Sequence, residues 1–221
     1  ARRLDRLREC LEDTPCEALV VSSPTNVLYL TGFEGSAGLL WVDGGKAILL
    51  TDGRYVEQAP DDLEKAGTST EVEVISCGPE KSLNRLSLGL SQIGLEAGHS
   101  TWGFQERLST ALESTRLVPT SGIVESLREI KDEGELARIE AAAAIADASL
   151  SDVWPMLEEE PSEREMARAI DETMRYRGAT DRAFSTIVAA GPNSARPHAR
   201  PEDRSIRFGD LVVFDLGAIV N

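Results

Sequence analysis

The chain has 221 residues, of which 41% are hydrophobic, enough to build a core in one or two domains. Its 38 acidic residues outnumber its 23 basic residues, and the resulting formal charge of −15 argues against nucleic acid as a partner, because phosphates carry the same sign. No apolar run has the length of a membrane span, and the three cysteines cannot all pair and lack metal-site spacing, so we expect a cytoplasmic protein without a membrane partner.

The first part of the chain alternates between helical and strand patterns. Leucines at helical spacing precede the apolar run 18–21, which predicts a helix followed by a buried strand. The runs 38–42 and 46–50 flank Asp43-Gly44-Gly45, so we expect a hairpin whose glycines adopt positive φ. The other expected elements are helices at 26–30, 83–90 and 102–112 and strands at 71–76, 93–96 and 117–118. This order predicts an α/β domain with a mixed sheet.

Two features of this part could suggest a ligand, and each has a simpler interpretation. The stretch GFEGSAG has neither of the glycine spacings that bind nucleotide phosphates, so we expect a loop whose backbone bends or packs closely. His99 and Trp102 are more simply a turn histidine and a core tryptophan than the lining of a pocket.

A domain boundary is expected at residues 119–122, where Pro-Thr-Ser-Gly interrupts the pattern, giving domains 1–121 and 122–221. Beyond it, apolar positions between 136 and 157 mark one face of a long helix that is broken near Pro155. Ser162 and Glu165 form a capping-box signature for a second helix, which is expected to end at Gly178.

The chemistry of the chain is concentrated near its end, where the apolar runs 184–190 and 211–216 predict two strands around a polar loop. His198 lies in that loop between two prolines, and it is either a solvated side chain or a catalytic one. Asp215 has only apolar neighbours in LVVFDLG, where an ionised carboxylate is costly unless a cation, hydrogen bonds or a metal compensates it. The residues alone leave open whether Asp215 binds metal or caps the turn at Gly217.

These segments resemble a known family. The stretches FSTIVAAGPNSARPH and RSIRFGDLVVFDLG are similar to motifs of the pita-bread metallopeptidases that act on Xaa-Pro bonds, namely Xaa-Pro dipeptidase (prolidase) and Xaa-Pro aminopeptidase. The similarity continues upstream through NVLYLTGFEGSAGLLWV, TDGRYVEQA, LEAGHSTW and SLREIKDEGELARIEAAAAIAD, and therefore spans almost the whole chain. It implies an α/β (α+β) fold: a creatinase-like N-terminal mixed-sheet domain followed by the first part of a pita-bread catalytic domain.

The resemblance also implies a mechanism and its site residues. Such enzymes hold two divalent metal ions (Mn, Co or Zn) with two aspartates, one histidine and two glutamates. Asp215 corresponds to the first of these ligands, and His198 to the histidine that contacts substrate or moves protons without binding metal. The implied substrate is an Xaa-Pro dipeptide or a peptide with an N-terminal Xaa-Pro sequence, and the implied assembly is a homodimer.

The remaining ligands of that set would lie beyond Asn221, so the sequence resembles the front part of an enzyme with an incomplete metal site. One aspartate cannot neutralise two cations, so we expect this chain alone to be inactive and to bind no metal. We also expect the first domain to fold independently and the second to need the missing part. Two alternatives remain: a creatinase-like amidinohydrolase, which needs no metal, and a non-catalytic peptidase-like binding module.

Overall fold

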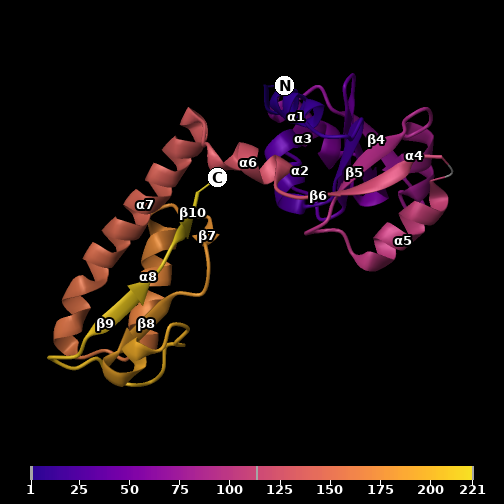
Figure 1. Cartoon of the computed structure of the whole chain (residues 1–221). Coiled ribbons are helices and arrows are strands. Elements are labelled where there is room, and N and C mark those ends of the chain that lie inside the picture. The colour runs from indigo at the N-terminus through magenta and orange to yellow at the C-terminus, as the bar shows by residue number, and fades with distance from the viewer. Residues whose placement is uncertain (1, 113, 221) are drawn as a thin grey trace. The chain divides into compact units, whose positions relative to one another are not determined.

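The structure of the chain, a computed structural model, describes residues 2–112 and 114–220. It forms two compact units, Ala1–Ile130 and Lys131–Asn221 (Figure 1). The division falls after residue 130 and not at the expected position 121/122, because helix α6 (Ile123–Glu129) buries Val124 and Leu127 in the core of the first unit. None of the described helices is both long and apolar enough to cross a membrane.

A six-stranded mixed sheet forms the centre of the first unit, as the sequence predicted. Its strand order is β4-β3-β2-β1-β5-β6, with β1 antiparallel to β2 and parallel to β5. The strands are β1 (Ala18–Val21), β2 (Gly38–Asp43), β3 (Ala47–Asp52), β4 (Glu71–Ile75), β5 (Gln92–Glu96) and β6 (Arg116–Thr120). The remaining helices of this unit are α1 (Arg2–Glu12), α2 (Pro24–Thr31), η1 (Gly53–Tyr55), α3 (Gln58–Lys65), α4 (Glu80–Leu86) and α5 (Trp102–Ala111).

Both faces of the sheet are buried at the central strand β1. Leu19 and Val21 of β1 join a cluster with residues of α1, α2, α3 and α6, whereas Ala18 and Val20 join a second cluster with residues of α4 and α5. Successive strand residues point to opposite faces, so a strand covered on both sides reads as a continuous apolar run. Trp102 is 75% exposed at the start of α5, so its predicted place in the core was wrong.

The side chain of Asp43 stabilises the turn of the β2–β3 hairpin. Asp43 Oδ1 accepts hydrogen bonds from the backbone N–H groups of Gly45 and Lys46, each at 2.9 Å. Neither Gly44 nor Gly45 has a positive φ, so the predicted hairpin is confirmed and the predicted glycine conformation is wrong. The aspartate carboxylate satisfies the turn's N–H groups and removes the need for a left-handed residue.

The second unit packs two helices against short strand pairs. Helices α7 and α8 both begin with a capping box, Asp132 with Glu135 and the predicted Ser162 with Glu165. Its elements are α7 (Glu133–Val153), η2 (Trp154–Glu159), α8 (Glu163–Tyr176), β7 (Asp181–Arg182), β8 (Ile187–Ala190), η3 (Gly191–Ala195), β9 (Val212–Asp215) and β10 (Ala218–Ile219). Strand β8 pairs antiparallel with β9, and β7 with β10.

Strand β9 has one covered face and one open face, whereas Val188, Ala189 and Ala190 of β8 are all buried. Val188, Ala190 and Phe214 pack with the buried methionines and isoleucine of α8 in the core of this unit. Leu211, just before β9, and Val213 lie toward solvent, with 81% and 44% of their surfaces exposed. The sequence predicted both strands, and the alternation along β9 decides which of its side chains are accessible.

Candidate functional site

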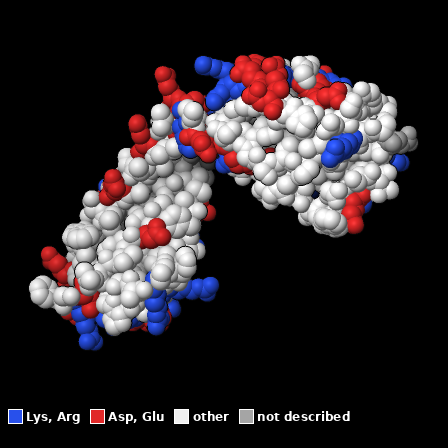
Figure 2. All heavy atoms as spheres, viewed as in Figure 1, with Lys and Arg blue, Asp and Glu red and all other residues white. Residues whose placement is uncertain are grey.

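His198 lies in the long connection between β8 and β9. After η3 the backbone turns again, with the N–H of Ala199 donating to the carbonyl oxygen of Arg196 at 3.2 Å. Ala199 is buried beneath this turn and His198 is exposed. Arginines 196, 200, 204 and 207 lie in the same connection, and Figure 2 shows basic groups at this end of the unit. The same connection contains Glu202, Asp203 and Asp210, and Arg196 and Arg204 pair with two of these acids, so the loop presents the imidazole to solvent among mixed charges.

Asp215 is the last residue of β9 and is paired with Ile187 of β8. It is exposed, so the burial that its apolar neighbours suggested was wrong. Along β9 the side chains alternate, and Asp215 shares the open face with Val213 while Phe214 packs into the core. The carboxylate is therefore available to a partner on that face and pays no desolvation cost in this structure.

Asp215 lies at the end of β9 and His198 in the loop that connects β8 to β9, and the two side chains do not contact each other through a hydrogen bond or an ion pair within residues 2–112 and 114–220. The same residues include no group of three or more histidine, cysteine or acidic side chains placed to hold a metal ion. A single exposed carboxylate does not fit the five-ligand set of a dinuclear centre, and we derive no chemistry through metal from these residues.

An ion pair shapes the end of the connection that leads into β9. Arg204 Nη2 lies 3.2 Å from Asp210 Oδ2, and Asp210 Oδ2 also accepts from the backbone N–H of Arg207 at 3.0 Å. That backbone hydrogen bond is the main cause that lowers the pKa of Asp210, with Arg204 adding to it. Gly191 at the start of the connection has φ +51°, and a β-carbon there would lie 2.6 Å from Arg204 Nη2. The glycine is needed because the two ends of the connection meet at this point.

Two carboxylates of α8 that the sequence did not single out hold the strand pair. Asp171 accepts from Thr186 Oγ1 at 2.5 Å and from Arg182 Nη1 at 2.6 Å, which fixes the chain just before β8. Glu163 is fully buried and contacts both sides of the loop that carries His198. Glu163 directly follows the capping serine, and the capping-box pattern drew attention to Glu165 alone.

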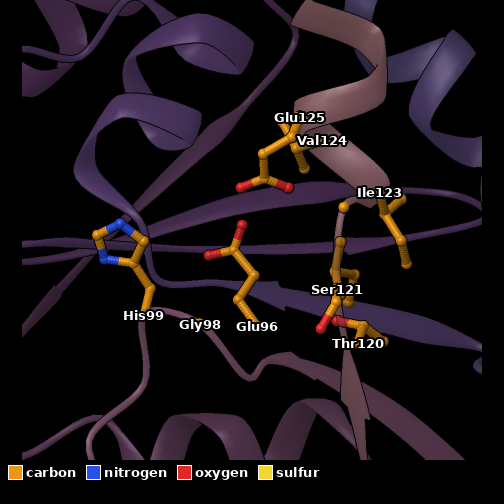
Figure 3. Close-up of a pocket in the computed structure, with 10 residues that line it drawn as sticks. Glu96, Gly98, His99, Thr120, Ser121, Ile123, Val124 and Glu125 are labelled. Atoms are coloured by element: carbon orange, nitrogen blue, oxygen red, sulfur yellow. The ribbon is translucent and has the colours of Figure 1, made fainter.

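The first unit contains a pocket of about 200 Å³ at the carboxyl ends of its parallel strands, lined in part by Glu96, His99 and Glu125 (Figure 3). Figure 3 shows the two carboxylates facing each other with the imidazole beside them. His99, interpreted from sequence as a turn histidine, is thus also part of a pocket lining.

Glu96 takes the place at the start of α2 where an anionic ligand could otherwise bind. Its Oε2 accepts from the backbone N–H groups of Ser22 and Ser23 at 2.6 and 2.7 Å. Helix N-termini attract anions through such N–H groups, and here the chain's own carboxylate uses them. The arrangement stabilises the junction of β1, β5 and α2. The N–H groups of Ser22 and Ser23 already donate to Glu96, so they are not available to a phosphate.

Two family profiles match the chain. The Creatinase/Prolidase N-terminal domain matches residues 3–130, and metallopeptidase family M24 matches residues 137–221. The first match ends at the division between the two compact units, at residue 130.

Individual proteins agree with these profiles. The uncharacterized peptidase YqhT of Bacillus subtilis (strain 168) is 34% identical over 224 residues, which cover 98% of this chain and 61% of that protein. A solved Xaa-Pro dipeptidase from Bacillus anthracis is 30% identical, with a TM-score of 0.89, over 98% of this chain and 60% of that one. The crystal structure of the N-terminal domain of cytoplasmic peptidase PepQ from Mycobacterium tuberculosis H37Rv is 36% identical, with a TM-score of 0.52, and covers 57% of this chain and 98% of that one.

The chain is thus a two-unit α/β protein, with a mixed-sheet domain followed by a unit in which two helices pack against short strand pairs. The chain belongs to the creatinase/prolidase family, with a Creatinase/Prolidase N-terminal domain and a region of metallopeptidase family M24. It spans about 61% of the length of the curated relatives that it matches.

Proposed function

We propose that the full-length gene product is a metallopeptidase that hydrolyses the bond between a residue and a following proline. The observation that carries this proposal is the position of Asp215 at the end of β9 and of His198 in the connection between β8 and β9, in a chain whose solved relatives include Xaa-Pro dipeptidases. Both side chains are exposed, which supports the proposal because a substrate or an ion could reach them. No observation of the structure favours a creatinase-like or a non-catalytic function over this one.

The residues have different roles in this proposal. In the full-length gene product Asp215 would be one ligand of a centre for two divalent ions, Mn, Co or Zn, and the other ligands would come from beyond the 221 residues. Bound ions of this kind polarise a carbonyl group and activate water. His198 binds the substrate carbonyl or moves a proton, since imidazole can do either near neutral pH. The substrate is an Xaa-Pro dipeptide or a peptide with an N-terminal Xaa-Pro sequence, and the protein acts as a homodimer.

The test compares His198→Ala and Asp215→Asn in the full-length gene product. His198→Ala is expected to lower kcat for an Xaa-Pro dipeptide by about 100-fold or more and to leave bound metal unchanged, because general acid–base groups contribute on that scale. Asp215→Asn is expected to lose bound metal. The measurements are proline release and metal content after gel filtration.

Matched controls come from the same chain. His99→Ala changes the other histidine, which lies in the first unit, and Asp203→Asn changes an aspartate whose side chain is 80% exposed in the second unit. Neither should alter kcat or metal content. Loss of metal in the His198 variant means that the two roles are exchanged. Metal-independent hydrolysis of creatine identifies a creatinase, and peptide binding without turnover identifies a binding module.

A further inference from the structure

Glu163 is a buried acid that neither the family motif nor the ligand set accounts for. It is the first residue of α8, and none of its surface is exposed. A buried carboxylate is strongly destabilising unless several hydrogen bonds or a cation compensate it. The groups that donate hydrogen bonds to Glu163 therefore indicate what it does.

Those groups lie on both sides of the loop that carries His198. Glu163 Oε1 accepts from the backbone N–H of Ala190 at 2.8 Å, and Oε2 accepts from the backbone N–H of Glu202 at 2.9 Å. The amide Nδ2 of Asn193 lies 3.2 Å from both oxygens. Ala190 is the last residue of β8 and Glu202 follows His198, so one carboxylate closes the loop at its base.

The start of α8 binds the far side of the loop through its backbone as well. The N–H of Glu163 donates to the carbonyl oxygen of Arg204 at 2.9 Å, and the N–H of Arg164 donates to that of Glu202 at 3.1 Å. The N–H of Ile206 donates to the carbonyl oxygen of Pro161 at 2.8 Å. These bonds hold residues 202–206, which follow His198, against the helix. Among the described residues at the start of α8, the Glu163 side chain alone also bonds to Ala190, which precedes His198.

A carboxylate suits this position for two reasons. It accepts up to about four hydrogen bonds and donates none, which matches three donor groups with no acceptor among them. The N-terminus of a helix also favours negative charge, which offsets part of the desolvation cost. Glutamine in its place would direct an NH₂ group toward a backbone N–H and leave a buried donor unsatisfied.

We propose that Glu163 is a positioning residue that fixes the loop carrying His198, and so places the imidazole for the Xaa-Pro reaction. Pro197 and Pro201 stiffen the segment between the two anchor points, so a displacement at its base moves the histidine as well. The part that concerns catalysis rests on the proposed function, whereas the loop anchoring stands on the geometry alone. Glu163 has no role in contacting the substrate.

The first test is independent of activity. Hydrogen–deuterium exchange of the full-length gene product is compared between the wild type, Glu163→Gln and Glu165→Gln, where Glu165 is the exposed capping-box acid of the same helical turn. Glu163→Gln is expected to speed exchange of the Ala190 and Glu202 amides by about 10- to 100-fold, because each amide loses a hydrogen bond to a charged group. Glu165→Gln should leave both amides unchanged. Asn193→Ala, a milder change, should accelerate the same amides less. Unchanged exchange in Glu163→Gln and Asn193→Ala overturns the anchoring.

The second test is a double-mutant cycle in the full-length gene product. Glu163→Gln is expected to lower kcat by about 10- to 100-fold with metal content unchanged, since a misplaced catalytic group costs on that order. In the His198→Ala background the same change should cost less than about 3-fold, because its effect passes through the imidazole. An equal loss in both backgrounds, or no loss in the first, shows a structural role only and overturns the positioning role. If His198→Ala itself keeps full activity, the proposed role of His198 fails, and the exchange measurement still decides whether Glu163 anchors the loop.

Discussion

In the first unit Asn26 lies between the carboxylates of Glu96 and Glu125 and donates a hydrogen bond to each of them. It is fully buried, and its Nδ2 donates to Glu96 Oε1 at 2.6 Å and to Glu125 Oε1 at 2.7 Å, while its Oδ1 accepts from Arg128 at 3.0 Å. The hydrogen bond from Asn26 is the main cause that lowers the pKa of Glu125, and Arg128 and His99 add to it. An amide has two N–H donors and an acceptor, and all three atoms are used here.

We expect Asn26→Asp to destabilise the first unit by about 3 kcal/mol at pH 7, because it removes two hydrogen bonds to charged groups and adds a third carboxylate. The pH dependence follows from the signs of the pKa shifts. In the wild type the lowered pKa of Glu125 contributes stability that is present above its ordinary value and is lost as pH falls through the lowered one. In the variant the crowded carboxylates have raised pKa values, so it gains stability relative to the wild type as pH falls from 7 to 4.

Guanidinium denaturation followed by tryptophan fluorescence at several pH values measures this difference. Asn84→Asp on α4 is the matched control, since no side-chain hydrogen bond of Asn84 is found among the described residues and it is only partly buried. A constant gap between the wild type and Asn26→Asp from pH 7 to pH 4 contradicts the carboxylate argument.

At the scale of elements, the β8–β9 connection contains two glycines with positive φ, Gly191 and Gly209. Gly191 has φ +51°, and a β-carbon there would approach both Arg204 Nη2 and Asp210 Oδ1 within 2.8 Å. Gly209, in the turn before β9, has φ +89° with nothing within 4 Å of a β-carbon. The two positions therefore separate the cost of the backbone conformation from the cost of the close contact.

We expect Gly209→Ala to destabilise the second unit by about 1–3 kcal/mol through its left-handed backbone alone. Gly191→Ala should cost more, because the added methyl group also displaces the Arg204–Asp210 ion pair. Hydrogen exchange of the β8 and β9 amides measures both losses in the same unit. Equal exchange rates in the two variants mean that the ion pair moves freely and that the contact is unimportant.

At the scale of the whole molecule, α6 decides where the first unit ends. Val124 and Leu127 are 1% and 5% exposed in the cluster that contains Leu4 and Leu7, and Tyr29 Oη donates to the carbonyl oxygen of Leu127 at 3.2 Å. A related N-terminal domain, that of PepQ, has been crystallised as a separate chain. The first unit thus has its own core, and α6 is part of it.

We expect the fragment 1–130 to unfold in one cooperative transition and the fragment 1–120 to be less stable by about 3 kcal/mol or more, the cost of exposing two buried aliphatic side chains and their neighbours. Urea denaturation of both fragments is the measurement. Val124→Ala with Leu127→Ala in the longer fragment should reproduce most of the loss, and Ser126→Ala on the exposed side of α6 should not. Equal stability of the two fragments would place the boundary at 121/122, as the sequence suggested.

Local patterns were sufficient to predict most helices and strands of this protein. The spacing of Leu4, Leu7 and Leu11, the continuous run of β1 and the capping box of Ser162 with Glu165 each reflect an interaction within a few residues or a single covered face. His198 and Asp215 stood out because their residue types are unusual in their surroundings. Periodicity and residue type are properties of a short segment, so the sequence alone carries them.

Only the tertiary structure decided which side chains are buried and which distant groups they meet. Asp215 lies on the open face of β9 and Trp102 on the surface, since burial depends on what packs against an element and not on its neighbours in sequence. The boundary after Ile130 follows from the contact of α6 with α1, and the role of Glu163 follows from donors 27 and 39 residues away. These contacts join residues far apart in the chain, and no local pattern encodes them.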